Sequence, residues 1–260
     1  MHLWLDNLSH NNRLRHLPPE HKLGFALVTL AIALIAHPPV QIAIAFWMSV
    51  WIVGYARIPV KVYGQMLGLA IAFWVTSIPA LMLSGVAVSE QASIQADVLS
   101  GLTIGSYYLY FSDRGLIQAG LIFWRTISTV SCLYFVLFTT PFTELLQVLR
   151  RFGCPLVLTE LLLLMYRFIF ILLSTARELW IAQQSRNGYC TRQRWIYSLS
   201  LLVSQLLQKT LEHYRQFVLS TAARGFNGEF RVWSSQNYHP NQRYTLEASL
   251  GCLALTVWNL

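Results

Sequence analysis

The sequence predicts an all-α fold: a polytopic membrane bundle of about five spans with an inserted cytoplasmic module of long amphipathic helices. The 260-residue chain is 55% hydrophobic and only 12% charged, whereas soluble domains carry about 25% charged residues. Apolar runs recur along the chain, and no block of residues has the alternation that is typical of strands. The net charge is +8, and the basic residues lie between and after the apolar runs. This distribution is typical of the positively charged cytoplasmic segments of a membrane protein and argues against a nucleic-acid partner.

The first section, residues 1–139, is expected to hold the N-terminal membrane helices. Residues 23–36 are apolar but short for a spanning helix, and "HPP" separates them from the apolar residues 40–56. Proline pairs stop helices, so two antiparallel helices joined by a tight turn are expected. A polar, partly basic stretch lies before the first apolar run, and it contains no signal-peptide cleavage site. We therefore expect the N-terminal segment to be retained and to lie in the cytoplasm.

Two further spans are expected in this section, at residues 62–84 and 116–139. Residues 85–115 between them are rich in Ser and Gly, and we expect them on the outer side, in part re-entrant or interfacial. Under this arrangement Arg114 is the only basic residue in an external segment, while most other Lys and Arg residues are cytoplasmic. The positive-inside rule supports this orientation.

The second section, residues 140–232, is expected to be a cytoplasmic module of coupling helices. "TTPFTELLQVLRRFGCP" predicts a short amphipathic helix that ends at Gly153, and long helices are expected over residues 156–184 and 194–224. The second of these has one apolar face and one polar face. The apolar face comprises Leu207, Leu211, Tyr214, Val218 and Ala222. The last section, residues 233–260, is expected to be a linker followed by a short or truncated span.

Two helix endings, "QSRNGY" and "AARGFNG", are the first candidate sites. One interpretation is structural: Gly188 and Gly225 cap the helices in the left-handed conformation, and Arg186 and Arg224 suit the negative ends of the helix dipoles. The other is docking, because an Arg guanidinium binds carboxylates bidentately. Small neighbours would let each tip enter a narrow groove: Ser185, Ala222 and Ala223. Composition leaves the two interpretations about equally weighted.

Charges inside apolar segments are the second candidates. Arg125 lies well inside the fourth span; such a residue is either functional, facing the bundle interior with a partner, or paired structurally or snorkelling. Glu160 and Arg167 are two helical turns apart and lie on one face, which favours a structural network with Tyr166.

No metal site and no resident cofactor are expected. The N-terminal histidines His2, His10, His16 and His21 have no carboxylate or cysteine cluster beside them. The four cysteines show no paired spacing. The chain also has no phosphate-binding glycine loop and no catalytic triad.

Several motifs resemble those of one family. They are "LDNLSHNNRLRHLPPEHKL", "ARIPVKVY", "FTTPFTELLQVLRRFGCP", "TELLLLMYRFIFILL", "AQQSRNGY" and "AARGFNGEF". Together, over roughly residues 6–232, the chain resembles the transmembrane T component of energy-coupling-factor (ECF) transporters, in the cobalt-type, CbiQ-like branch. The last motif is close to the Ala-Arg-Gly signature of the family. The earlier one departs from it, since Ser185 replaces Ala and Asn187 separates Arg186 from Gly188.

The resemblance implies a non-catalytic coupling subunit of a bacterial or archaeal plasma membrane. Its partners would be two ATPase subunits, which bind ATP, and a membrane S component that binds the metal ion, cobalt or nickel. Arg186 and Arg224 would dock into the ATPases, with a narrow tip formed by Ser185, Gly188, Ala222, Ala223 and Gly225. No nucleic acid is expected as a partner, and the lipid bilayer surrounds the spans.

Two other functions compete with this interpretation. A membrane-embedded enzyme acting on lipid-like substrates would have to rely on Arg125 and the cytoplasmic surface. A membrane scaffold or chaperone without a transport role is the third hypothesis, and the repeated Arg-bearing tips count against it.

Overall fold

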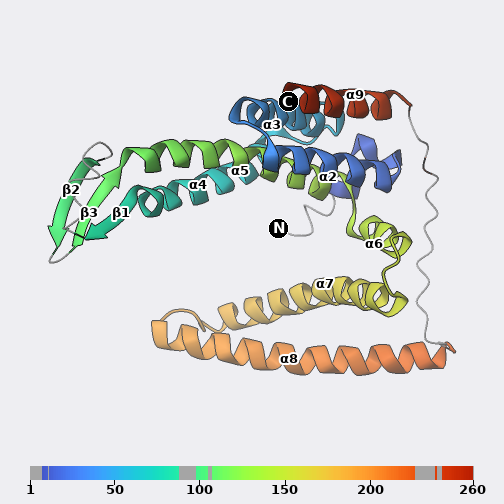
Figure 1. The fold of residues 1–260 in the computed structure, drawn as a ribbon. Coiled ribbons are helices and arrows are strands. Elements are labelled where there is room, and N and C mark those ends of the chain that lie inside the picture. Colours follow the sequence, from blue (N-terminus) through green and yellow to red (C-terminus); the bar gives the residue numbers. More distant parts are fainter. Residues whose placement is uncertain are drawn as a thin grey trace. The chain divides into compact units, whose positions relative to one another are not determined.

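A computed structural model of the chain describes residues 8–10, 12–87, 98–104, 107–225, 238 and 242–259 (Figure 1). The chain divides into two compact units. The first comprises Met1–Leu145 with Gln236–Leu260, and the second comprises Leu146–Ser235.

The first unit is mainly a bundle of helices. These helices are η1 (Arg13–His16), α2 (Pro19–Ile35), α3 (Pro38–Val50), η2 (Trp51–Tyr55), α4 (Val60–Met82), α5 (Asp113–Thr139) and α9 (Gln242–Asn259). Only Ala36 and His37 separate α2 from α3, and Pro38 begins the new helix because a proline at the first position loses no helical hydrogen bond. The expected tight turn between two apolar helices is therefore confirmed. A π-helical turn, η2, continues α3.

Between α4 and α5 lies a small antiparallel sheet. Its strands are β1 (Leu83–Ala87), β2 (Val98–Ile104) and β3 (Tyr107–Ser112), in the order β1-β3-β2. Leu83 pairs with Phe111, and Leu102 pairs with Leu109. The expectation that this region forms no strands is therefore wrong. The aromatic-rich sequence "YYLYFS" of β3 has high strand propensity, but serines and glycines around it mask the alternation.

The all-α membrane class is confirmed, and the spans differ in part from those expected. Within the part of the chain that the structure describes, four helices are long and apolar enough to cross a membrane: Pro38–Tyr55, Val60–Met82, Gly115–Thr139 and Leu156–Ser185. The first three match expected spans. The fourth was expected in the cytoplasmic module, although it has the length and composition of a span. Helix α2 has 17 residues, in keeping with its expected shortness.

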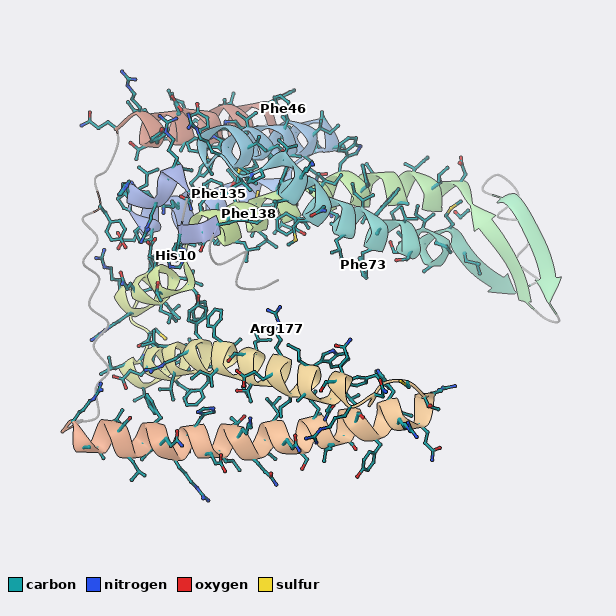
Figure 2. All side chains as sticks on the ribbon, turned by 180° about the vertical axis from the view of Figure 1, so that it is seen from behind. His10, Phe46, Phe73, Phe135, Phe138 and Arg177 are labelled. Carbon is teal, nitrogen blue, oxygen red and sulfur yellow. The ribbon has the colours of Figure 1, made fainter. Side chains whose placement is uncertain are left out.

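Aromatic side chains are distributed between the core of the first unit and its surface (Figure 2). Phe135 and Phe138 of α5 are buried, whereas Phe46 of α3 and Phe73 of α4 are 73% and 76% exposed. Large exposed apolar side chains on spanning helices are suited to contact with lipid. The outward face of this unit is therefore of the kind that a bilayer covers.

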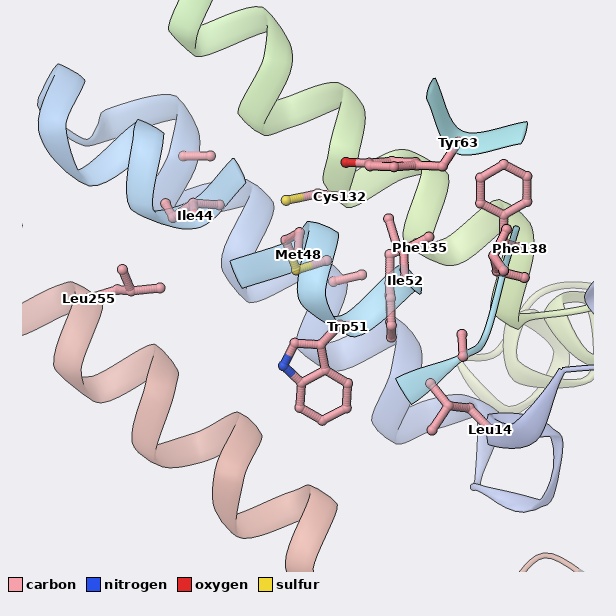
Figure 3. Close-up of a cluster of buried hydrophobic side chains, with 14 of the residues drawn as sticks. Leu14, Ile44, Met48, Trp51, Ile52, Tyr63, Cys132, Phe135, Phe138 and Leu255 are labelled. Carbon is pink, nitrogen blue, oxygen red and sulfur yellow. The ribbon is translucent and has the colours of Figure 1, made fainter. Parts of the chain in front are cut away.

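Helix α9 completes the core of the first unit, although it comes from the far end of the sequence. Asn259 Oδ1 accepts a hydrogen bond from the backbone N–H of His37 (3.1 Å), so the carboxyl ends of α9 and α2 lie together. At the other end, the ring of Tyr244 lies 6.1 Å from that of Trp51, which is 5.0 Å from Phe25 of α2. The two helices therefore run parallel. Leu255 of α9 joins the buried cluster (Figure 3).

The second unit is an antiparallel helical hairpin formed by α7 (Leu156–Ser185) and α8 (Arg192–Ala223). Helix α6 (Phe142–Arg151) precedes it. Gly153, two residues after this helix, has a left-handed φ of +89°, in keeping with the expected end of the helix at this glycine. Phe168 of α7 and Phe217 of α8 pack edge to face, with ring centroids 5.8 Å apart. Residues 186–191 connect the helices.

The face by which α8 packs differs from the apolar face that the sequence predicts. Ser198 and Leu202 are buried, whereas the predicted face is exposed at Leu207, Leu211, Tyr214, Val218 and Ala222. The face that meets α7 contains small and polar side chains, so hydrophobicity alone does not identify it. The apolar stripe of α8 is left uncovered within this unit.

Candidate functional site: the two arginine-bearing helix ends

The end of α7 is a tight, fully hydrogen-bonded turn. Arg186 is the C-cap residue, with φ −95° and ψ 16°. The N–H of Asn187 donates to Gln184 O (3.1 Å) and that of Gly188 donates to Gln183 O (3.0 Å). This pair of bonds is the Schellman motif, which satisfies carbonyls that a helix end would otherwise leave unpaired. The turn fixes the backbone of Arg186 at the tip.

The end of α8 has the same local geometry. Arg224 is its C-cap residue, with φ −92° and ψ 10°. Its N–H donates to Thr221 O (3.1 Å), as the N–H of Arg186 does to Gln183 O (3.2 Å), and the N–H of Gly225 donates to Ala222 O (3.0 Å). Gly225 then takes a left-handed φ of +69°. The two arginines therefore occupy equivalent positions on two helix ends.

At the first tip, the sequence predicts that Gly188 takes the left-handed conformation. In the structure the left-handed residue is Asn187 instead. Asn187 has φ +54°, a conformation that Asn tolerates better than most residues with a Cβ. Asn187 thus takes the place that Gly225 has at the second tip. Gly188 has a different role: an added Cβ would lie 2.7 Å from Ser198 Oγ and 2.9 Å from Gln183 O.

Both tips present their arginines to solvent. Arg186 and Arg224 are exposed, and so are their small neighbours Ser185, Ala222 and Ala223. Among the described residues, neither guanidinium forms an ion pair. Within the described chain, each tip therefore presents an unpaired guanidinium beside small side chains, an arrangement that can bind a carboxylate.

The hairpin places the two arginines at opposite ends of the second unit. Arg186 follows α7 and lies next to the start of α8, while Arg224 lies at the far end of α8 (Figure 1). Helix α8 has 32 residues, and at 1.5 Å per residue it is about 48 Å long. A single small molecule cannot bridge the two guanidinium groups. The arrangement fits two separate contacts with a large partner.

The charged residues within apolar helices do not converge. Arg125 is exposed on α5, where its backbone carbonyl accepts hydrogen bonds from Ser128 Oγ (2.9 Å) and Thr129 Oγ1 (2.8 Å). The guanidinium of Arg167 lies over the ring of Phe217, 5.3 Å from its centroid. This contact joins α7 to α8. It differs from the expected network, in which Glu160 and Arg167 would interact along one face of α7.

A buried polar cluster at the end of α5 was not identified from the sequence. Asn12 Nδ2 donates to Phe138 O (3.0 Å), and Lys22 Nζ donates to Thr139 O (3.1 Å). Lys22 also lies 3.7 Å from the carboxylate of Glu144 on α6. Both donors cap the carbonyl end of α5, where the helix dipole favours a cation. A Lys directly before an apolar run and a Glu after "TTP" are the only signals in the sequence.

Burial dominates the charge states of this pair. It lowers the pKa of Lys22 below its ordinary value of 10.5, with the nearby Glu144 offsetting part of the effect. Burial also raises the pKa of Glu144, against the charge of Lys22 and a hydrogen bond from Tyr238. Both shifts favour the neutral forms.

Metal ligands do not gather in the part of the chain that the structure describes. Within those residues, no three His, Cys, Asp or Glu side chains lie close enough together to hold a metal ion. His2 lies outside the described residues.

Comparison with known proteins shows the family. A family model described as "Cobalt transport protein", CbiQ, matches residues 10–234. The chain is 27% identical over 231 residues to the cobalt transport protein CbiQ of Salmonella typhimurium, covering 88% of this chain and 99% of that protein. It is 28% identical over 234 residues to CbiQ of Rhodobacter capsulatus, covering 89% and 88% of the two chains.

A fused relative matches in the same way. The putative fused cobalt transport protein CbiMQ of Methanocorpusculum labreanum is 28% identical over 225 residues, or 86% of this chain and 36% of that protein. With the family model covering most of the chain and the apolar helices in place, the protein belongs to the CbiQ family of cobalt transport proteins and is a multi-pass membrane component.

Proposed function

We propose that the chain is the transmembrane coupling subunit of an ECF-type importer. It links ATP hydrolysis by two partner ATPase subunits to movement of a substrate-binding S component, for uptake of cobalt or nickel. The chain itself is non-catalytic, and ATP is bound by the partners. We place it in a bacterial or archaeal plasma membrane with its N-terminus in the cytoplasm.

One observation carries this proposal: the equivalent backbone geometry of Arg186 and Arg224 at the two ends of one rigid hairpin. A chain that does no chemistry can transmit work only through rigid elements that are held at more than one point. Two exposed guanidinium groups, one beside the start and one at the end of a helix about 48 Å long, suit a dimeric partner that offers one acidic groove per subunit.

The uncovered apolar stripe of α8 supports the second partner. Leu207, Leu211 and Tyr214 are more than half exposed, and exposed apolar patches of this kind mark protein or membrane contacts. We assign this stripe to contact with the S component. Cobalt is favoured over other substrates because the family is described as a cobalt transport protein and the Salmonella and Rhodobacter relatives carry the same name.

Charge reversal at the tips tests the proposal. Arg224→Glu and Arg186→Glu should each abolish co-purification of the ATPase subunits with the full chain, because a carboxylate repels an acidic groove. The level of the membrane-inserted chain should stay unchanged.

Arg215→Glu is the matched control. Arg215 is exposed in the last third of α8, nine residues before Arg224 and outside both tips, so its reversal should leave co-purification intact. If both tip variants retain their ATPases at the level of Arg215→Glu, the docking proposal fails.

A further inference from the structure

Arg125 lies deep inside the spanning helix α5. The apolar part of this helix, Gly115–Thr139, has 25 residues, and Arg125 lies about 15 Å along the axis from its first residue and about 21 Å from its last. The hydrocarbon core of a bilayer is about 30 Å thick, so the Cα of Arg125 is far from both membrane surfaces. A charged side chain at this depth is costly when it faces lipid, and it is normally paired within the protein.

The first unit leaves the side chain of Arg125 uncovered. Arg125 is exposed, and among the described residues no acceptor pairs with its guanidinium. Helix α4 packs against the other side of α5: Trp74 Nε1 donates to Ala119 O (3.0 Å), and the ring centroids of Trp74 and Phe123 are 4.6 Å apart. Phe123 precedes Arg125 by two residues, or about 200° around the helix, so Arg125 lies on the side of α5 away from α4.

The same side of α5 is packed in the other half of the helix. Cys132 follows Arg125 by seven residues and therefore lies on the same face, yet it is 1% exposed and belongs to the core of the first unit (Figure 3). Toward the other end of α5, Leu121 and Gln118 share this face and are exposed. The core thus covers one half of the face and leaves the other half open. We call this open half, Gln118, Leu121 and Arg125, the Arg125 face.

The chemistry of the Arg125 face indicates what covers it. Within the described part of the chain, the side-chain amide of Gln118 also has no hydrogen-bond partner, and lipid chains offer no acceptor to either group. A guanidinium pairs best with a carboxylate, through two parallel hydrogen bonds. Residues 38–82 and 114–139 contain no Asp or Glu, so a second copy packed through these helices cannot supply one. The face is therefore complementary to a spanning helix of a different membrane protein.

We propose that the Arg125 face is a docking surface inside the membrane for one spanning helix of the S component. That helix has an Asp or Glu near its middle, and the carboxylate accepts hydrogen bonds from the guanidinium of Arg125. Leu121 packs against apolar side chains of the same helix, and Gln118 bonds to a polar group nearer its end. This contact lies within the bilayer and is additional to the contact with the α8 stripe. The inference rests on the proposed coupling role, because that role supplies the partner.

Co-purification of the S component with the tagged full chain, from cells that carry the complete transporter, tests this surface. Arg125→Leu and Arg125→Glu should each reduce the recovered S component by about tenfold or more, because the buried carboxylate of the partner loses its counter-charge. Arg125→Lys keeps the charge and should recover more S component than Arg125→Leu does. The ATPase subunits should be recovered at the wild-type level with all three variants.

Arg13→Leu is the matched control. Arg13 is an exposed arginine of η1, outside the spanning helices, so its replacement should leave recovery of the S component unchanged. A folding defect cannot account for loss of the partner in Arg125→Leu, because this variant removes a charge that is costly in lipid. The amount of membrane-inserted chain should therefore equal or exceed that of the wild type.

Three outcomes would overturn the inference. If both Arg125→Leu and Arg125→Glu recover as much S component as Arg13→Leu, the docking surface is wrong and the coupling role stands. If the wild type recovers no S component, both proposals fail. If the isolated wild-type chain forms a dimer that Arg125→Leu dissolves, a second copy of the chain occupies the face.

Discussion

Lys22 and Glu144 place opposite charges 3.7 Å apart, with side chains that are 2% and 7% exposed. Taking such a pair out of water costs several kcal/mol per ion, and the mutual attraction does not reliably offset it. The lowered pKa of Lys22 and the raised pKa of Glu144 indicate that burial outweighs attraction at both groups. On this balance the pair positions α6 against the end of α5 without adding net stability.

Replacing both charges should make the protein more stable. The double variant Lys22→Met with Glu144→Leu should raise the free energy of unfolding in detergent by about 1–4 kcal/mol, because apolar side chains of similar size avoid the desolvation cost. Asn12 Nδ2 remains 3.4 Å from Thr139 O, so that carbonyl keeps a neighbouring donor. Denaturation followed by tryptophan fluorescence would measure the change.

Measuring the free energy of unfolding at several pH values tests how protonation of Glu144 changes the stability of the fold. Because the pKa of Glu144 is raised in the fold, the folded protein binds that proton more tightly than the unfolded chain does. Its contribution is complete below the ordinary pKa of 4.5 and is lost as the pH rises through the raised value. The stability deficit of the wild type relative to the double variant should therefore narrow on acidification. A deficit that widens on acidification would contradict the assigned direction.

Among the secondary-structure elements, the helix ends are predicted best from the sequence. At one of them, the end of α7, the sequence predicts the wrong residue for the left-handed position. The glycine caps at Gly153 and Gly225 follow from composition, because glycine adopts a positive φ without strain. At α7 the sequence offers both Asn187 and Gly188, and both types can take this position. The choice is made by tertiary contact: Gly188 is needed where Ser198 Oγ donates to its carbonyl oxygen (2.9 Å).

The sheet and the packed face of α8 could not be predicted for a different reason. Pairing of Leu83 with Phe111 joins residues far apart in the chain, and no local pattern encodes such a register. Helix α8 meets α7 through Ser198 and leaves Leu207 and Leu211 exposed. Apolar periodicity reports which face avoids water but not which partner covers it. The helical bundle itself could be predicted from composition, because a long apolar helix is recognised from its own residues and does not depend on pairing with a distant segment.

Helix α9 depends on a single glycine for its contact with α3. A Cβ at Gly251 would overlap the ring of Trp47, so Gly251→Leu should force the helices apart and lower the free energy of unfolding by about 1–3 kcal/mol. Gly120→Leu is the control, because it has open space on an exposed face and gains helix propensity. Equal stability of the two variants in chemical denaturation would show that α9 does not pack as described.

For the whole molecule, both arginine-bearing tips should be needed for coupling, so the effects of changing them on transport should not add. If coupling requires both contacts, Arg186→Glu and Arg224→Glu should each reduce cobalt uptake by about tenfold or more, and the double variant should lose little beyond either single one. Independent sites this far apart would instead contribute additively. Uptake of radioactive cobalt by cells that carry the complete transporter would measure this. Full uptake in both single variants would contradict the coupling role.

The first unit contains both Met1–Leu145 and Gln236–Leu260, and this has a consequence for synthesis. Trp47 and Trp51 are made early, but their neighbours on α9, Gly251 and Tyr244, emerge only after the whole α7–α8 hairpin. Until then, the side of α2 that α9 will cover has only lipid or a chaperone to shield it. Closure of the first unit therefore waits for α9, and biogenesis of this unit should be limited by the arrival of α9 and not of α2.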